Sequence, residues 1–218
     1  VPIPAVADPL LQGLTIPADA PTRGMWGATQ PWPMNGLHAV LMPSGKVLTY
    51  GTPLNVPGTQ DGRTYDQWDP SLGFGAGSHV TSYEAGRYNS FCSAAAWLPD
   101  GRLLVTGGNS ANNSVIVNAS SGATVNDPLA LADQRWYATM LTLPDGRPLI
   151  LGGMDPYSEG MVGNPDAAIA NGTVSMTPEV YTPGTGWQSL TGARSRDAFG
   201  PDYLRASYPR AWVAPSGK

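Results

Sequence analysis

The sequence predicts an all-β fold built from repeated four-stranded sheets, and three observations support this prediction. Glycine (27) and proline (22) together exceed a fifth of the 218 residues, while 41% are hydrophobic and only 13% are charged. This composition suits short strands joined by tight turns. No stretch of three helical turns keeps a 3.6-residue apolar stripe free of glycine and proline, which argues against long amphipathic helices. The third observation is an internal repeat.

Four segments share one pattern of an apolar run, a tight turn and a second apolar run that ends at glycine. They cover residues 37–51, 93–107, 138–152 and 209–218, and the fourth holds only the first run and the turn. Each turn reads Pro-(Asp or Ser)-Gly-(Lys or Arg). Proline fixes φ at the first corner, Asp or Ser accepts local hydrogen bonds, and glycine takes the positive φ that closes a hairpin with a bulge. Each unit is therefore expected to begin with a β-hairpin.

The spacing of these turns indicates the architecture. The turn prolines are Pro43, Pro99, Pro144 and Pro215, so successive units lie 56, 45 and 71 residues apart. Periods near 50 residues, with a double glycine after the second strand, are typical of Kelch-type propeller blades. Each blade is a four-stranded sheet, and its first strand is expected nearest the central axis.

The expected domain organisation follows from the repeat. Residues 1–23 are expected to form an N-terminal extension and residues 24–218 a partial propeller, with blades at roughly 24–80, 81–130 and 131–195 and a fourth begun. Radial sheets close only when the circle is full. The chain is thus expected to need a second polypeptide, the rest of a cleaved precursor or another copy of itself. A short solenoid-like array is the structural alternative.

Charge and hydropathy exclude two classes of partner. The net charge is −4 and no run of like charge appears, whereas nucleic-acid binding needs a basic surface. No apolar stretch approaches the 18 residues of a membrane span. The first residue is Val1 rather than methionine, which favours a removed leader or tag.

Equivalent positions of the repeat are expected at equivalent places around the axis. Cys92, Tyr137 and Tyr208 each precede their turn proline by seven residues, and Gly36 holds this slot in the first unit. Cys92 and Tyr137 should therefore lie at the same height at the axial ends of neighbouring blades, close enough for contact. A lone cysteine is by default a small buried hydrophobe, so this juxtaposition makes Cys92 a candidate for chemistry.

The segments that carry these residues, 89–109 and 135–147, resemble the galactose oxidase/glyoxal oxidase family of copper-radical oxidases. The Phe-Cys pair at Cys92, the Arg-Trp-Tyr triplet at Tyr137 and residues 32–42 are closer to the glyoxal oxidase branch. The match covers only the first half of the family's catalytic region. It implies a seven-bladed propeller, of which this chain supplies about three blades and the start of a fourth.

The resemblance implies a redox cofactor made from side chains. In the family, the residues matched by Cys92 and Tyr137 are joined by a thioether bond, and the tyrosine also ligates copper. The cross-linked phenol stores one electron equivalent as a tyrosyl radical, and copper stores the other. Together they oxidise a primary alcohol or aldehyde, and dioxygen then reoxidises the site and leaves as hydrogen peroxide. Such an oxidase is expected to be secreted, in an extracellular or periplasmic location.

The family's other copper ligands, a tyrosine and two histidines, are expected from a second chain or a C-terminal fragment. The two histidines present here are not predicted to bind the metal. His38 is expected on the same strand face as the slot at Gly36, where it either lines the axis or forms hydrogen bonds in the core. His79 is expected in a surface loop.

One departure from galactose oxidase concerns the tryptophan that stacks on the cross-linked tyrosine. Met154 stands at that place in this sequence, which makes a sugar-specific oxidase a poorer expectation. Trp136 is expected on the strand face opposite to Tyr137, packed between sheets. Tyr208 has two open interpretations, as a pocket-lining residue or as ordinary core packing.

Two alternative functions remain. The first is a non-catalytic Kelch propeller that serves as a binding scaffold, with Cys92 a packed thiol and Tyr137 an ordinary aromatic. The second is a hydrolase or lyase, for which no Ser-His-Asp or paired-carboxylate arrangement stands out. Asp61, Asp66 and Asp69 are predicted to be turn residues.

Overall fold

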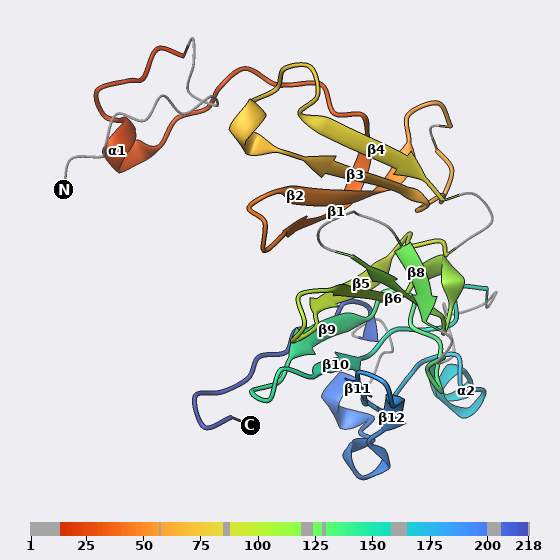
Figure 1. The fold of residues 1–218 in the computed structure, drawn as a ribbon. Coiled ribbons are helices and arrows are strands. Elements are labelled where there is room, and N and C mark those ends of the chain that lie inside the picture. Colours follow the sequence, from red (N-terminus) through yellow and green to blue (C-terminus); the bar gives the residue numbers. More distant parts are fainter. Residues whose placement is uncertain are drawn as a thin grey trace.

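The chain folds into three four-stranded antiparallel sheets, each a meander in chain order (Figure 1). The computed structural model describes residues 14–56, 58–84, 88–118, 124–127, 130–157, 165–199 and 206–217. The first sheet holds β1 (Met34–Leu41), β2 (Val47–Pro53), β3 (Thr64–Trp68) and β4 (His79–Tyr83). The second holds β5 (Ser93–Trp97), β6 (Leu103–Gly107), β7 (Ser114–Val117) and β8 (Thr124–Asp127). The third holds β9 (Thr139–Thr142), β10 (Pro148–Leu151), β11 (Glu179–Thr182) and β12 (Gly186–Ser189).

Helices are few and short in the described residues, as the composition predicts. They are α1 (Ala20–Arg23) and α2 (Pro165–Ala170), with the 3-10 turns η1 (Pro70–Leu72), η2 (Gly108–Ser110), η3 (Thr191–Ala193) and η4 (Asp197–Phe199). None of the helices in this part of the chain is long and apolar enough to cross a membrane. Figure 1 shows α1, and the described segment that joins it to β1, extending away from the stacked sheets.

The predicted turns form the first hairpin of every sheet. Gly45, Gly101 and Gly146 have φ values of 81°, 80° and 84°, the positive values that this hairpin needs. The expected blade boundary after residue 80 is wrong by a few residues, because the first sheet continues to Tyr83. The outer strand β4 is largely exposed, so it lacks the apolar alternation by which a strand is recognised.

The sheets pack face to face, so the middle sheet is covered on both sides. Leu103 and Val105 of β6 join a core cluster with Tyr65 of the first sheet. Leu104, on the other face of β6, packs with Tyr181 of the third sheet. A strand buried on both faces is apolar at successive positions rather than at alternate ones. The first strands β5 and β9 also lie next to each other, as expected for strands near a common axis.

Two sequence predictions in the first sheet are wrong. Asp66 is not a turn residue but a fully buried residue of β3, and its Oδ2 lies 2.8 Å from Nδ1 of His79. His79 begins β4 and its side chain is only 21% exposed. Thr81 donates a second hydrogen bond to the same carboxylate, at 2.7 Å. Pairing of β3 with β4 brings these groups onto one face, which local turn chemistry does not reveal.

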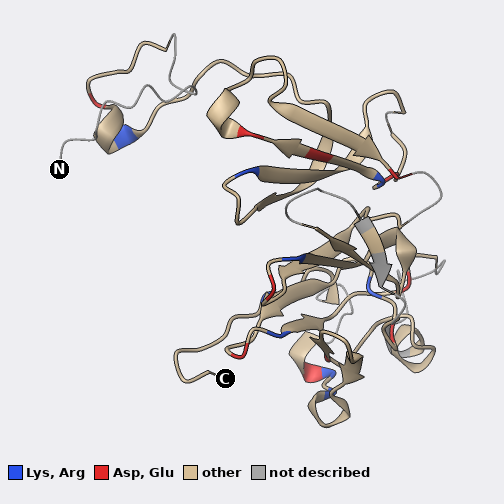
Figure 2. Ribbon diagram, in the orientation of Figure 1, with Lys and Arg blue, Asp and Glu red and all other residues tan. Residues whose placement is uncertain are grey.

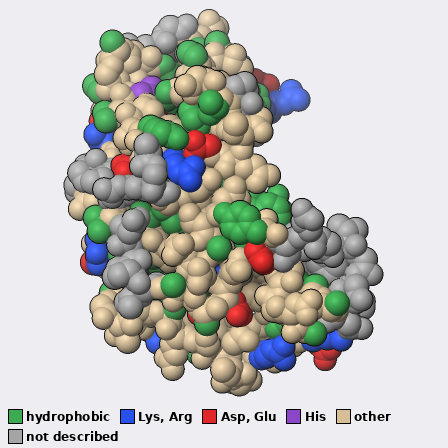
Figure 3. Space-filling model, turned by 90° about the vertical axis from the view of Figure 1, so that its right-hand side faces the viewer, with side chains coloured by type: hydrophobic (Ala, Val, Ile, Leu, Met, Phe, Trp, Pro, Cys, Tyr) green, Lys and Arg blue, Asp and Glu red, His purple; other side chains and the backbone are tan. Residues whose placement is uncertain are grey.

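Charged side chains are sparse and well separated along the fold (Figure 2). On the face shown in Figure 3, apolar side chains reach the surface at several places between isolated charges. Asp69 and Asp61 keep the predicted turn role, since Asp69 accepts a hydrogen bond from the N–H of Ser71 and Asp61 from that of Arg63. No basic patch is visible in these views.

Candidate redox centre

Cys92, Tyr137 and Tyr208 share one unusual backbone conformation. Their φ values are 60°, 61° and 46°, in the left-handed region that residues other than glycine rarely adopt. Cys92 immediately precedes β5, and Tyr137 lies two residues before β9. The repeat therefore places the same conformation at the entrance to β5 and β9, and again at Tyr208, after which the described residues form no strand.

The three residues form a row at the axial end of the sheets. The N–H of Tyr137 donates to the carbonyl oxygen of Cys92 at 3.1 Å, and the N–H of Tyr208 donates to that of Tyr137 at 2.5 Å. The ring centroids of the two tyrosines are 4.9 Å apart. The Cys92 thiol and the two phenols are close enough to shift one another's pKa values. The structure thus brings Cys92 and Tyr137 together, while their catalytic and copper-binding roles stay predictions.

The protonation states at this centre follow from burial. Burial raises the pKa of the Cys92 thiol, and hydrogen bonds with the two phenols oppose that shift. The pKa of Tyr137 is also raised, first by burial and then by the neighbouring Cys92. Both groups are therefore protonated at neutral pH. The thiol therefore carries the hydrogen that it would lose if the sulfur were joined to a ring carbon of Tyr137.

Cys92 is held by contacts that fix the three residues before it. Asn89 accepts a hydrogen bond from the N–H of Gly62 at 2.8 Å and one from the N–H of Phe91 at 3.1 Å. The hydroxyl of Ser90 donates to the carbonyl oxygen of Gly62. On the other side, a Cβ at Gly108 would lie 2.4 Å from the carbonyl oxygen of Phe91. The backbone that leads into Cys92 is therefore enclosed from both neighbouring loops.

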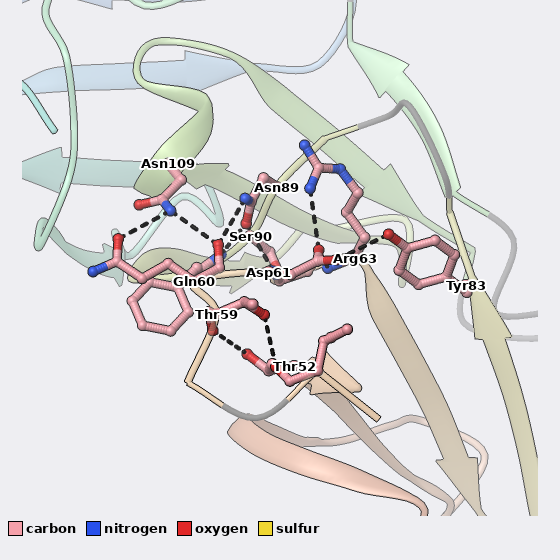
Figure 4. A network of polar contacts seen from close by, with 12 residues as sticks. Thr52, Thr59, Gln60, Asp61, Arg63, Tyr83, Asn89, Ser90 and Asn109 are labelled. Carbon is pink, nitrogen blue, oxygen red and sulfur yellow. Dashed lines mark hydrogen bonds and ion pairs between the residues drawn. The ribbon is translucent and has the colours of Figure 1, made fainter. Parts of the chain in front are cut away.

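A polar network extends these contacts outwards (Figure 4). Asn89 and Asn109 both donate to the carbonyl oxygen of Gln60, at 2.9 and 3.0 Å. Asp61 next to Gln60 accepts hydrogen bonds from Arg63 at 3.1 Å and from Tyr83 at 2.9 Å. The network joins the loop between β2 and β3 to the segment that precedes β5, and so links the first two sheets at the end where Cys92 lies.

Tyr137 is positioned by a buried ion pair two residues away. Arg135 is fully buried, and its Nη2 lies 2.7 Å from Oε1 of Glu179, which is 1% exposed. The same guanidinium donates to the carbonyl oxygens of Gly152 and Thr177, at 2.8 and 2.7 Å. Burial lowers the pKa of Arg135, and Glu179 opposes the shift. The Arg-Trp-Tyr triplet drew attention to Arg135 in the sequence, but nothing in the sequence indicated that Glu179 is its partner.

Trp136 does not lie on the opposite side of a strand from Tyr137, as alternation predicted. Their rings are stacked, with centroids 3.8 Å apart and planes 20° apart. The left-handed backbone at Tyr137 breaks the alternation that the prediction assumed. Trp136 also packs against the core cluster that contains Met154. A tryptophan therefore covers the phenol ring even though Met154 occupies the other expected place.

Each of the two histidines has another aromatic or polar partner. A register shift between Gly36 and His38 moves His38 off the face of the slot, and its ring stacks on Tyr50 with centroids 4.8 Å apart. Its pKa is lowered by burial. His79 is paired with Asp66 in the first sheet. His38 is thus a partly buried residue that packs on Tyr50, and His79 belongs to a polar pair between outer strands.

The donor atoms offered here fit part of a copper site. Within the described residues, no group of three or more His, Cys, Asp or Glu side chains is arranged to hold a metal. The phenol oxygen of Tyr137 is a donor of the type that suits Cu(II), and its side chain is half-buried. The described part of the chain therefore fits the role of supplying one ligand rather than a complete coordination sphere.

Comparisons with known proteins show what this chain is similar to. Residues 78–177, which include both Cys92 and Tyr137, match the family model described as "Glyoxal oxidase N-terminus". Two galactose oxidase sequences from Gibberella zeae are each 28% identical over 211 residues, covering 94% of this chain and 28% of the relative. The chain thus spans little more than a quarter of the curated relatives it matches.

A solved structure shows the same fold. A fungal alcohol oxidase of the AA5 family, in complex with copper, superposes with a TM-score of 0.55 and 19% identity, over 75% of this chain and 32% of that one. The predicted resemblance and the all-β Kelch-type propeller fold are confirmed by these findings. The number of blades in the complete propeller stays a prediction.

Proposed function

Because this chain is a relative of the galactose oxidases and glyoxal oxidases, we propose that it supplies the Cys92–Tyr137 cofactor of a copper-radical oxidase. The observation that carries the proposal is the backbone pairing that brings the two residues together, in which the N–H of Tyr137 donates to the carbonyl oxygen of Cys92 at 3.1 Å. Forming the thioether removes one hydrogen from the sulfur and one from a ring carbon of Tyr137. The two electrons and two protons pass to dioxygen, which becomes hydrogen peroxide.

Each residue has a distinct part in this proposal. The Tyr137 oxygen binds copper, which when bound supplies one of the two electron equivalents of the reaction. The Cys92 sulfur, as a ring substituent, makes the phenol easier to oxidise. Trp136 covers a face of the ring and keeps water from it. Arg135 and the loop at Gly62 hold the two backbones in place, since such a centre depends on fixed geometry.

The proposed reaction is a two-electron oxidation. A primary alcohol loses one hydrogen from carbon and one from oxygen and becomes an aldehyde, or an aldehyde hydrate becomes an acid. Dioxygen accepts both hydrogens and is released as hydrogen peroxide. A small alcohol or aldehyde is the substrate class that the resemblance favours, and we place the enzyme outside the cytoplasm on the same ground.

The remaining ligands, a tyrosine and two histidines, are proposed to come from sequence outside this chain, in a second polypeptide or a C-terminal segment. Apolar side chains at the outer parts of the fold support a covering partner. Leu41 of β1 is 68% exposed and Tyr83 of β4 is 54% exposed, and Trp26 and Trp212 are 100% and 78% exposed. A partner that covered these side chains would remove their apolar surface from water.

The test is peptide mapping of the full-length protein after incubation with copper in air. The proposal expects a mass lower by two hydrogen atoms and a peptide that joins Cys92 to Tyr137. The Cys92→Ser variant, which keeps the shape of the side chain, should show neither. A free Cys92 that is fully alkylated in the copper-loaded, aerated protein would instead favour the scaffold function. A peroxide-coupled screen of small alcohols and aldehydes then addresses the substrate.

A further inference from the structure

We infer that Tyr208 is a third member of the redox centre, a positioning residue that directs the Cys92 sulfur onto the ring of Tyr137. The inference deepens the proposed function and rests on it. The sequence left Tyr208 open between core packing and pocket lining. Core packing does not explain it, because the side chain is 46% exposed.

The backbone of Tyr208 is the first argument. Its φ of 46° is unfavourable for a residue with a side chain, and the following Pro209 restricts it further. Such strain persists only where surrounding contacts determine the conformation, and it is concentrated at functional sites. Among the described residues, only Cys92, Ala111, Tyr137 and Tyr208 combine a side chain with a positive φ. Three of these four occupy the same repeat position.

The contacts that hold this strained segment are specific. A Cβ at Gly152 would lie 2.6 Å from both the carbonyl oxygen of Ala206 and Cγ of Pro209. The N–H of Gly153 donates to the same carbonyl oxygen at 2.8 Å. The double glycine at the end of β10 therefore receives the chain that leads through Tyr208. These contacts hold the backbone on both sides of Tyr208, while the residue itself remains 46% exposed.

The phenol of Tyr208 meets both partners of the proposed cross-link. Its ring centroid is 4.9 Å from that of Tyr137, with planes 38° apart. Its hydroxyl is near enough to the Cys92 thiol for the two groups to shift each other's pKa. Sulfur is a weak acceptor with little directional preference of its own. The two neighbouring phenols restrict where the sulfur can lie, and contact between the rings restricts how Tyr137 is turned. Both restraints favour attack of the sulfur at one ring carbon.

The test follows the rate of cross-linking in the full-length protein. Copper-free protein is mixed with copper and dioxygen, samples are quenched over time, and the fraction of joined Cys92–Tyr137 peptide is measured by mass spectrometry. Tyr208→Phe keeps the ring but loses the hydroxyl, and we expect the rate to fall about five-fold, the effect of one hydrogen bond. Tyr157→Phe is the matched control, because the hydroxyl of Tyr157 donates to the carbonyl oxygen of Asn109 and should not affect the rate.

A second variant separates positioning from folding. Tyr208→Asn tolerates the left-handed backbone but removes the ring, so its rate should fall further than that of Tyr208→Phe. Thermal melting of the copper-free proteins should be the same for wild type and both variants. If one variant melts at a lower temperature than wild type, the cross-linking rate of the other variant tests the positioning role.

The outcomes separate the two proposals. An unchanged rate in a folded Tyr208 variant, with a cross-link that forms normally in wild type, overturns the positioning role and leaves the proposed function intact. Absence of any cross-link in wild type overturns both.

Discussion

Replacing Glu179 by glutamine should destabilise the protein through the buried Arg135 it leaves behind. Glu179 accepts three hydrogen bonds, from Arg135 at 2.7 Å and from the backbone N–H groups of Ala132 and Asp133 at 2.9 and 3.3 Å. Both members of the ion pair are at most 1% exposed. Removing one partner of a buried pair costs about 3–5 kcal/mol, because the other charge stays in the interior. The total stability of a domain is only about 5–15 kcal/mol, so the effect should be large.

Urea denaturation followed by tryptophan fluorescence measures this loss. The matched control is Asp100→Asn. It breaks the ion pair between Asp100 and Arg102, which has a similar length of 2.6 Å, but the side chains of Arg102 and Asp100 are 42% and 46% exposed. Exposed pairs contribute about 1 kcal/mol or less, so the control should scarcely shift the midpoint. Equal, small losses for the two variants would refute the view that the Arg135–Glu179 pair anchors the segment before Tyr137.

Two further predictions concern the packing that surrounds the centre. Gly108→Ala should lower the free energy of unfolding by at least about 2 kcal/mol, because φ is 66° and the new Cβ would lie 2.4 Å from the carbonyl oxygen of Phe91. The control is Gly184→Ala, at φ 79° with open space around it, which should cost only the backbone strain of about 1–2 kcal/mol. Equal losses of stability for the two variants in urea denaturation would contradict the argument from close approach. Burial raises the pKa of Tyr50 and Tyr88 in the folded protein. The stability that these phenols contribute is therefore fully present below their unfolded pKa of about 10 and is lost as the pH rises through their pKa values in the folded protein. Circular dichroism should therefore show unfolding above about pH 10, at higher pH for Tyr50→Phe than for wild type, and a transition that the variant does not move would count against this assignment.

The sequence predicted the features that depend on local chemistry. The Pro-(Asp or Ser)-Gly turn dictates a hairpin by itself, and Asp100 and Asp145 accept hydrogen bonds from the N–H groups of Arg102 and Arg147 as that turn requires. The spacing of Cys92 and Tyr137 from their turns was enough to place them at equivalent positions. Both conclusions use only short-range rules that the chain obeys in each repeat.

The sequence failed where the answer depended on pairing between strands. His79 follows a run of glycine, alanine and serine that indicates a loop, yet register with β3 places it beside Asp66. His38 was assigned a face by alternation, and a bulge at Gly36 invalidates that count. Trp136 was misplaced because alternation does not hold across a left-handed residue. For His38 and Trp136, one irregular residue changes the face on which the neighbouring side chains lie.

The left-handed slot shows how a repeat can become a reactive centre. A repeat alone gives equivalent backbones, but Cys92, Tyr137 and Tyr208 pay a conformational cost of about 1–3 kcal/mol each that a glycine would avoid. Gly36, in the same slot of the first unit, is not among the residues with positive φ. The strain therefore coincides with the slots whose side chains meet, and each strained slot has its own support: the loop at Gly62, the buried Arg135, and the double glycine beneath Pro209. Since these supports differ in sequence from one repeat to the next, the centre depends on them as much as on the three residues that they hold.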